Sequence, residues 1–167
     1  MNPWAFIALG ANLGHAIQTL TAAVQHLERH SDAPILKSSL WESDPVDCPP
    51  GSPKFVNAVV GIAPRNGETP ETLLAKLQEL ETVFGRKPKT ITNEPRPLDL
   101  DLIAFGDETR SGPSLILPHP RATQRRFVLQ PLTEIAPDLF LPGQTRTVRQ
   151  LLAALPSEPK VMLLQRD

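Results

Sequence analysis

Residues 94–105 read EPRPLDLDLIAF, and the run LDLDLI at 98–103 decides the fold. Leucine and aspartate alternate there one by one, which is the period of a β-strand, where successive side chains point to opposite faces. Leu98, Leu100 and Leu102 therefore face a core beneath helices, and Asp99 and Asp101 face the other way. We expect a strand that carries two carboxylates on the face opposite its apolar one.

The aspartate pair needs an explanation, because Asp is depleted from strands. The Cα atoms of Asp99 and Asp101 would lie about 6.7 Å apart. Two charges at that spacing repel by roughly 2–3 kcal/mol at an effective dielectric constant near 20. A divalent cation removes this repulsion, and oxygen ligands select hard ions such as Mg²⁺. A solvated polar face on an ordinary amphipathic strand is the alternative, and a D-x-D motif alone does not decide between them.

Positive charge gathers in the sequence around this pair. Of the 17 lysines and arginines, eight fall between residues 86 and 126, with His119 among them: Arg86, Lys87, Lys89, Arg96, Arg110, Arg121, Arg125 and Arg126. A metal-bound polyphosphate needs such a neighbourhood, because the metal bridges phosphate oxygens and arginines take up the remaining charge. Charged residues are usually only solvated, and Arg96, three residues before Asp99, is the strongest single candidate. The glycine-rich phosphate loops G-x-x-x-x-G-K-[ST] and G-x-G-x-x-G are absent, so side chains and metal would have to hold a nucleotide.

A second polar residue lies inside an apolar strand pattern, KFVNAVV at 54–60. Asn57 shares a face with Phe55, whereas Val56, Ala58 and Val60 face the core. An asparagine amide suits the mixed donor and acceptor edge of a planar heterocycle, and an aromatic ring suits its face. An asparagine bonded to loop backbone is an equally good interpretation.

Length and composition narrow the class of protein. A chain of 167 residues predicts one domain, residues 1–167, and the formal charge of −1 gives no large nucleic-acid footprint. The single cysteine, Cys48, allows no intrachain disulfide, and no apolar run reaches the roughly 20 residues of a membrane span. We therefore expect a cytoplasmic protein with no nucleic-acid or membrane partner. Prolines concentrate at 44–53 and 88–97, and we interpret the loops at 44–53 and 86–96 as lids.

The order of the predicted elements indicates the fold. Strands are expected at 4–9, 35–42, 54–63 and 98–105, the last in a hairpin with 114–118, and helices at 15–30, 70–85, 122–132 and 148–155. This order favours an α+β fold: a ferredoxin-like sandwich with a mainly antiparallel sheet, helices packed on one face, and a C-terminal extension.

Several motifs together resemble one known family. They are Pro95-Arg96 before LDLDLI, LPHPR at 117–121, RRFVLQPLTEIAPDL at 125–139, FVNAVV at 55–60 and IALGANLG at 7–14. With them the chain, from Phe6 to Leu155, resembles the 6-hydroxymethyl-7,8-dihydropterin pyrophosphokinases of folate biosynthesis. The resemblance implies a ferredoxin-like sandwich. It also implies transfer of the β,γ-pyrophosphate of ATP to the pterin hydroxymethyl oxygen, with release of AMP.

The resemblance also implies roles for individual residues. Asp99 and Asp101 would hold two Mg²⁺ ions on the ATP triphosphate and form the catalytic set with Arg86 and Arg96. The ATP contacts would be Gln78, Arg86, Arg96, Leu102, His119 and Arg125. The pterin contacts would be Gly10, Ser43, Val46, Phe55, Asn57 and Phe127, with the two phenylalanines sandwiching the ring and Asn57 reading its edge. The substrates would be ATP and 6-hydroxymethyl-7,8-dihydropterin, and the protein would be a monomer. Glu81 matches a position of the family pattern to which we assign no role.

This sequence also departs from the family pattern. Thr92-Asn93-Glu94 stands where the family usually has Arg-Trp-Gly, and Pro88 replaces a loop arginine. From these departures we expect the chain to lack an aromatic lid contact worth about 1 kcal/mol and one phosphate contact, while both aspartates are present. Two other functions remain open on the motifs alone. One is a different Mg²⁺-dependent phosphohydrolase or transferase that uses the D-x-D pair, and the other is a non-catalytic ferredoxin-like binding module.

Overall fold

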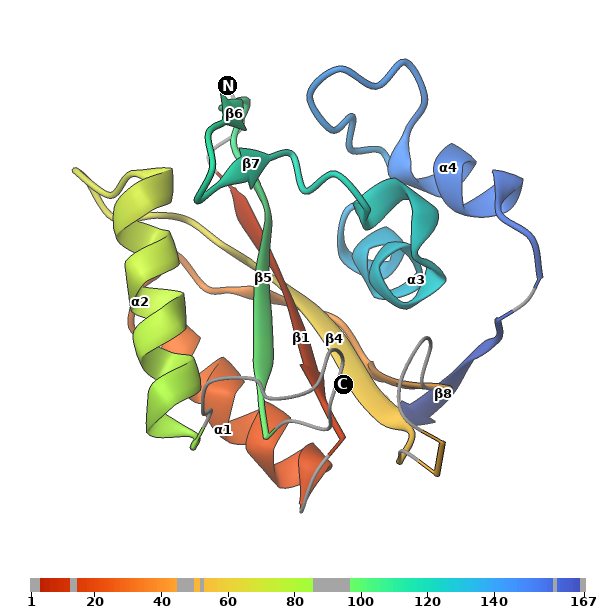
Figure 1. The fold of residues 1–167 in the computed structure, drawn as a ribbon. Helices are drawn as coiled ribbons and strands as arrows, with labels where there is room; N and C mark the ends of the chain where they lie inside the picture. Colours follow the sequence, from red (N-terminus) through yellow and green to blue (C-terminus); the bar gives the residue numbers. More distant parts are fainter. Residues whose placement is uncertain are drawn as a thin grey trace.

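The computed structural model describes residues 4–12, 15–44, 50–51, 53–85, 97–157 and 159–165. Its main sheet is antiparallel at every described pairing and runs in the order β5, β1, β4, β3, β8, with β2 paired to β4 (Figure 1). The strands are β1 (Ala5–Ala11), β2 (Leu36–Lys37), β3 (Leu40–Ser43), β4 (Phe55–Ile62), β5 (Asp99–Phe105) and β8 (Val161–Gln165).

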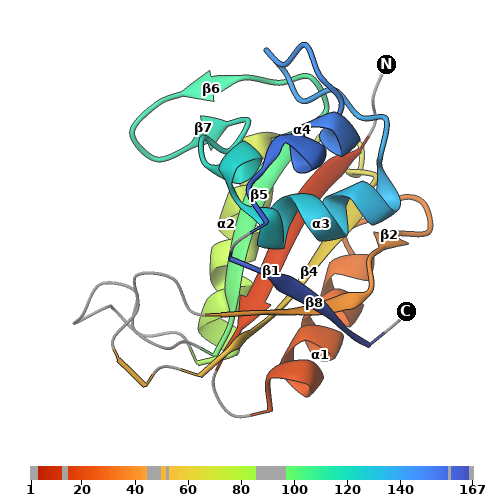
Figure 2. The ribbon, with the colours of Figure 1, turned by 90° about the vertical axis from the view of Figure 1, so that its right-hand side faces the viewer.

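Helices cover both faces of this sheet. On one face lie α1 (Ala16–Glu28) and α2 (Pro70–Val83), and on the other lie α3 (Arg126–Ile135) and α4 (Val148–Ala154). Figures 1 and 2 show the sheet between these two helical layers. The sequence predicted helices on one face only, so the second layer corrects that expectation. The apolar side of a helix indicates burial but does not tell which face of a sheet it covers.

The first core lies between the sheet and α1 and α2. The strands contribute alternate residues, and the helices contribute leucines that recur on one helix face. These are Leu20 and Leu27, seven residues apart on α1, and Leu73, Leu77 and Leu80, four and three residues apart on α2. Leu98, Leu100 and Leu102 belong to this core and are at most 6% exposed. The alternation predicted for LDLDLI is therefore confirmed.

The second core lies between the opposite face and α3 and α4. Phe6, Val59 and Ile103 from the sheet pack there against Leu129 and Leu132 of α3. Residues 6 and 59 alternate with residues of the first core, so β1 and β4 each serve both cores.

The start of α2 follows from its local sequence. Thr69 Oγ1 accepts a hydrogen bond from the Thr72 backbone nitrogen at 3.1 Å, and Pro70 occupies the first turn. A threonine cap followed by proline is a strong helix start signal. Gly85, with a φ of +92°, follows the helix in a conformation that glycine adopts without strain. The predicted helix at 70–85 is thereby confirmed as α2, with Val83 as its last helical residue, and it places Glu81 against β5.

Three details differ from the sequence prediction. The strand expected at 35–42 is broken into β2 and β3, because the Ser38 hydroxyl accepts from the Val59 backbone nitrogen at 2.9 Å and donates to the Ser39 carbonyl at 2.8 Å. The helix expected at 122–132 begins as a 3₁₀ turn, η1 (Ala122–Gln124), and continues as α3. The C-terminal strand β8 was not predicted, and its residues Met162, Leu163 and Leu164 are exposed.

The predicted hairpin of 98–105 with 114–118 is also wrong. β6 (Arg110–Ser111) and β7 (Ile116–Leu117) pair with each other in a separate two-stranded sheet. Arg110 of this hairpin contacts α2 through a 2.6 Å ion pair with Glu71. β5 stays at the end of the main sheet. Within the described residues, no helix is both long and apolar enough to cross a membrane.

Candidate active site

A row of four directly paired residues crosses the sheet on the face that also carries α3. Asp99 of β5 pairs with Gly10 of β1, Gly10 pairs with Asn57 of β4, and Asn57 pairs with Trp41 of β3. Directly paired residues of an antiparallel sheet share a face. The predicted metal ligand and the predicted pterin reader therefore lie on the same surface, separated only by a glycine.

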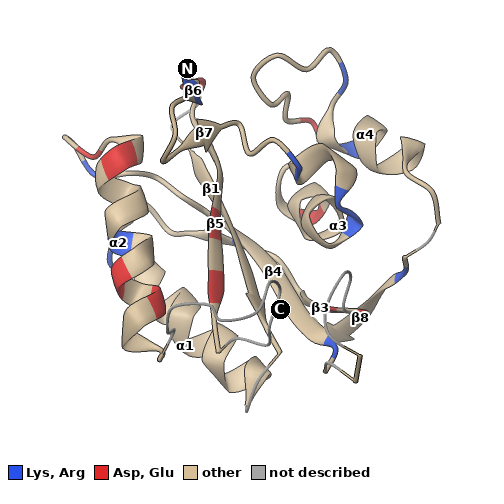
Figure 3. Cartoon of the chain, viewed as in Figure 1, with Lys and Arg blue, Asp and Glu red and all other residues tan. Residues whose placement is uncertain are grey.

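The two aspartates of β5 both point to this face and are half-buried. Figure 3 shows them as two acidic positions one after the other along β5. Their neighbours in β1 are small, since Asp99 pairs with Gly10 and Asp101 with Ala8. Small neighbours leave room for an ion beside the carboxylates.

The donor set around these carboxylates suits magnesium. Among the residues that the structure describes, no group of three or more His, Cys, Asp or Glu side chains is placed to hold a metal ion. Zinc and calcium sites are usually built from more protein ligands than two. Mg²⁺ is bound in proteins through one or two carboxylates, with waters and substrate phosphates completing the shell. Asp99 and Asp101 fit that pattern.

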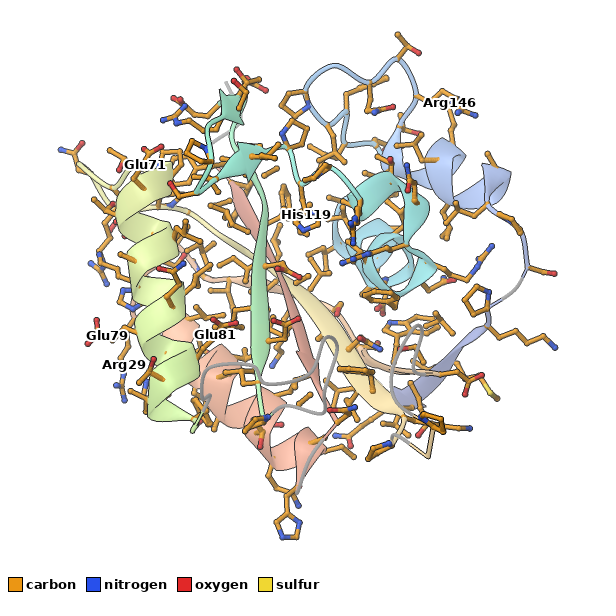
Figure 4. The ribbon with its side chains drawn as sticks, in the orientation of Figure 1. Arg29, Glu71, Glu79, Glu81, His119 and Arg146 are labelled. Carbon is orange, nitrogen blue, oxygen red and sulfur yellow. The ribbon has the colours of Figure 1, made fainter. Side chains whose placement is uncertain are left out.

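His119 stands beside the same strand. Its backbone nitrogen donates to the Ile103 carbonyl at 2.9 Å, which fixes the loop next to β5, and Figure 4 places its ring between β5 and α3. Burial, followed by the charges of Arg125 and Arg121, lowers the pKa of His119 below its ordinary value, while Asp99 acts in the opposite direction.

The tautomer of His119 follows from its contacts. Nδ1 accepts a hydrogen bond from the Arg121 backbone nitrogen at 3.2 Å. The lowered pKa favours the neutral ring, and in the neutral ring this hydrogen bond leaves the proton on Nε2. The histidine can therefore donate one hydrogen bond from Nε2 to an anionic oxygen.

At the start of α3, a predicted ATP contact and a predicted pterin contact touch each other. The Arg125 guanidinium lies over the ring of Phe127, 5.5 Å from its centroid, within the range of a cation–π interaction. Since Arg125 also acts on the pKa of His119, these three residues form one neighbourhood.

Asn57 is held within the sheet by a side chain. It is 3% exposed, and its Nδ2 donates to Ser43 Oγ at 2.7 Å. A Cβ at Gly10 would lie 3.6 Å from Asn57 Oδ1 and 3.7 Å from Phe55 Cδ1, so both side chains converge on the glycine. The structure brings Gly10, Ser43, Phe55 and Asn57 together. The sequence also allowed Asn57 to be hydrogen-bonded to loop backbone. Its amide nitrogen instead donates to the side chain of Ser43, a residue of β3.

With this geometry in place, comparison with known proteins identifies the family. The family model of 7,8-dihydro-6-hydroxymethylpterin-pyrophosphokinase (HPPK) matches residues 6–137. The chain belongs to this family. A 2-amino-4-hydroxy-6-hydroxymethyldihydropteridine pyrophosphokinase of Pseudomonas aeruginosa is 38% identical over 154 residues, covering 92% of each chain. The Bacillus subtilis protein of the same name is 39% identical over 136 residues, covering 81% of this chain and 79% of its own.

Solved structures confirm the α+β fold. Plasmodium falciparum HPPK-DHPS, crystallised with pterin and p-hydroxybenzoate, superimposes on 92% of this chain with a TM-score of 0.67 at 14% sequence identity. The chain spans 43% of the length of that larger protein. At this identity the likeness establishes the HPPK fold alone.

The remaining residues implied by the HPPK resemblance fall into two groups. Arg86, Arg96 and Val46, like most of the two predicted lids, lie outside the described residues. Gln78 is exposed on α2, three residues before Glu81. Leu102 is 4% exposed, with its side chain in the first core, so its predicted ATP contact would have to come from its backbone.

Two carboxylates hold the strands around the site: Glu134, which sequence reasoning missed, and Glu81, which it noted without a role. Glu134 of α3 accepts from the Ser39 backbone nitrogen at 2.9 Å, from Ser39 Oγ at 2.6 Å and from Trp41 Nε1 at 2.8 Å. It thereby ties α3 to the strand that carries Trp41 and Ser43. Glu81 of α2 accepts from the Leu100 backbone nitrogen. Both glutamates lie in helices, and helix periodicity does not reveal a hydrogen bond to a distant strand.

Proposed function

We infer that this chain transfers pyrophosphate from ATP to the hydroxymethyl group of 6-hydroxymethyl-7,8-dihydropterin and releases AMP, a step of folate biosynthesis. The observation that carries this conclusion is the row from Asp99 through Gly10 to Asn57. It brings a carboxylate suited to a metal and an amide suited to a heterocycle onto one face. Membership of the HPPK family supports the same reaction.

At the nucleotide end, we propose that Asp99 and Asp101 hold two Mg²⁺ ions on the triphosphate. The metal supplies charge neutralisation at the phosphate oxygens. The positive side chains proposed to share that role are Arg86, Arg96 and Arg125. His119, whose Nδ1 accepts from the Arg121 backbone nitrogen, is suited to donate a hydrogen bond from Nε2 to a phosphate oxygen. Gln78 and the backbone of Leu102 are the proposed contacts nearer the nucleoside.

At the pterin end, Asn57 is the proposed reader of the ring edge. The hydrogen bond from Nδ2 to Ser43 orients its amide, which leaves Oδ1 directed toward Gly10. The proposed ring sandwich consists of Phe55 from β4 and Phe127 from α3, with Val46 completing the pocket. Because Arg125 already lies over Phe127, binding of the pterin and binding of the nucleotide phosphates involve adjoining side chains.

The proposed chemistry is an in-line displacement at the β-phosphorus of ATP. The substrate hydroxyl oxygen forms a bond to that phosphorus and loses its proton to solvent, and the bond to the bridging oxygen of the α-phosphate breaks, so AMP leaves. Positioning and charge neutralisation supply most of the rate enhancement in phosphoryl transfer. The residues of this chain orient the pterin hydroxyl and stabilise the phosphate charges.

A product assay tests the proposal. The purified protein is incubated with ATP, Mg²⁺ and 6-hydroxymethyl-7,8-dihydropterin, and the nucleotides are separated by chromatography. We expect AMP and pterin pyrophosphate in equal amounts. ADP or free phosphate in their place would favour the phosphohydrolase or another transferase, and a lack of Mg²⁺-dependent ATP binding in calorimetry would favour the binding module.

A further inference from the structure

One buried carboxylate outside the aspartate pair reaches the strand that carries it. Glu81, on α2, is 8% exposed, and its Oε2 accepts a hydrogen bond from the Leu100 backbone nitrogen at 2.8 Å. Figure 4 shows Glu81 between α2 and β5, and Glu79 on the side of α2 away from the sheet. Leu100 is the residue between Asp99 and Asp101.

The direction of this bond follows from the strand order. β5 lies at one end of the main sheet and pairs there with β1. In an antiparallel pair, the backbone N–H and C=O of a given residue point either to the partner strand or away from it. The Leu100 N–H goes to α2 and therefore points away from β1. An edge N–H of this kind is otherwise left to water or to another strand.

A carboxylate is a costly choice for this position. The neighbouring inward residues of α2 are Leu73, Leu77 and Leu80, so an apolar side chain at residue 81 would extend an existing apolar face. Burial of a carboxylate is unfavourable unless hydrogen bonds compensate it. Glu81 accepts a hydrogen bond from the backbone between the two aspartates, which points to a role in arranging them.

We propose that Glu81 is a positioning residue for the magnesium site. Its bond to the Leu100 N–H fixes the β5 backbone between Asp99 and Asp101, and so keeps their carboxylates at the spacing that a metal–triphosphate needs. This inference rests on the proposed function, since it takes the aspartates as the magnesium ligands. Groups that orient metal ligands commonly act in this way on metal affinity.

The test uses three variants of the full chain. Glu81→Leu removes the acceptor and retains an apolar side chain suited to the helix face, so it is expected to fold. Glu81→Gln retains an oxygen that can accept from Leu100. Glu79→Gln makes the same chemical change at an exposed position of the same helix.

The first readout is hydrogen exchange of the Leu100 amide in the ligand-free protein, followed by NMR. We expect exchange at least about fivefold faster in Glu81→Leu than in wild type, consistent with loss of one hydrogen bond. Glu81→Gln and Glu79→Gln should exchange at the wild-type rate. Unchanged Leu100 exchange in Glu81→Leu would overturn the proposal.

The second readout is the Mg²⁺ concentration that gives half-maximal binding of a non-hydrolysable ATP analogue, measured by calorimetry. We expect this concentration to rise roughly tenfold in Glu81→Leu and to stay near the wild-type value in Glu81→Gln. A merely structural role would lower the unfolding temperature of Glu81→Leu without moving the Mg²⁺ midpoint, and that result would overturn the proposal.

Asp101→Asn, titrated in parallel, separates the two levels of the inference. If it raises the Mg²⁺ midpoint while Glu81→Leu does not, the role of Glu81 is wrong and the proposed function stands. If neither variant changes the midpoint, the magnesium assignment itself is wrong, and the positioning role falls with it.

Discussion

The two faces of the main sheet are built for different purposes, although the same strands supply both. On the face of α1 and α2, β1 contributes Ala5, Ile7, Leu9 and Ala11 to a continuous apolar core. On the opposite face, the same strand contributes Phe6 and Ala8 to the core beneath α3 and α4, and then Gly10 beside Asp99 and Asn57. The first face of β1 is apolar along its whole length. The second face is apolar at Phe6 and Ala8 and lies beside polar side chains at Gly10.

This difference shows how the fold separates stability from function. Because side chains alternate, a strand such as β5 can bury leucines in one core while its aspartates face the other side. Substitutions on the two faces of β5 should therefore have different consequences: those on the leucine face should lower stability, and those on the aspartate face should lower activity.

The largest effect is expected on the aspartate face. Asp101→Asn should lower kcat by roughly 10³-fold, because a metal contact worth several kcal/mol is lost. Its unfolding temperature should stay close to that of wild type, because Asp101 is half-buried and belongs to neither core. Steady-state AMP production and thermal unfolding measure the two quantities. A kcat within tenfold of wild type would contradict the metal role.

The matched change on the leucine face should have the opposite profile. Leu98 is fully buried in the first core, so Leu98→Ala should lower the free energy of unfolding by about 3 kcal/mol through cavity formation. The Mg²⁺ midpoint for binding of an ATP analogue should not change. Guanidinium unfolding and calorimetry give both values. If Leu98→Ala shifted the Mg²⁺ midpoint while the free energy of unfolding changed little, the two faces of β5 would not have separate roles.

A smaller effect is expected at the glycine between the two subsites. In Gly10→Ala the new Cβ would meet Asn57 and Phe55 at ordinary contact distances, so the fold should tolerate it. The methyl group would occupy space on the pterin side, and we expect pterin affinity to fall about tenfold, or about 1.4 kcal/mol. Affinity for the ATP analogue should not change. Calorimetry with each ligand separately tests this, and equal losses for both ligands would argue against two distinct subsites.

The smallest effect concerns the pH dependence of stability. The pKa of His119 is lowered in the folded state from its ordinary value of 6.5, so below that pH the unfolded chain binds more protons than the folded one. Stability is therefore fully present above pH 6.5 and falls as the pH drops below it. His119→Gln should flatten this fall in urea unfolding between about pH 5 and 7.

His30 is the matched residue after α1, and its pKa is also lowered by burial and then by Lys76. His30→Gln should likewise flatten the fall. However, it should leave the pH profile of AMP production unchanged, whereas His119→Gln should alter it. Identical activity profiles for the two variants would contradict the placement of His119 at the site.

Local sequence patterns predicted which face of its strand each candidate site residue occupies. The arrangement of the strands and helices depends on long-range pairing that these patterns do not show. Alternation in LDLDLI was sufficient to place Asp99 and Asp101 on a face of their own, and alternation in KFVNAVV did the same for Asn57. The sequence did not predict that Asn57 lies near the two aspartates, because this depends on β4 and β5 both pairing with β1 in a particular register. The second helical layer and the hydrogen bonds of Glu81 and Glu134 were missed for the same reason: their partners lie on distant segments. β8 was missed because its side chains remain exposed and its pattern carries little burial signal.

The central claim is that Asp99 and Asp101 jointly bind magnesium at the phosphates of ATP. A crystal structure of the protein with Mg²⁺, a non-hydrolysable ATP analogue and the pterin tests it most directly. We predict that carboxylate oxygens of both residues lie about 2.1 Å from metal ions that also contact phosphate oxygens. Fully occupied ligands with both carboxylates turned away from every cation would contradict the account.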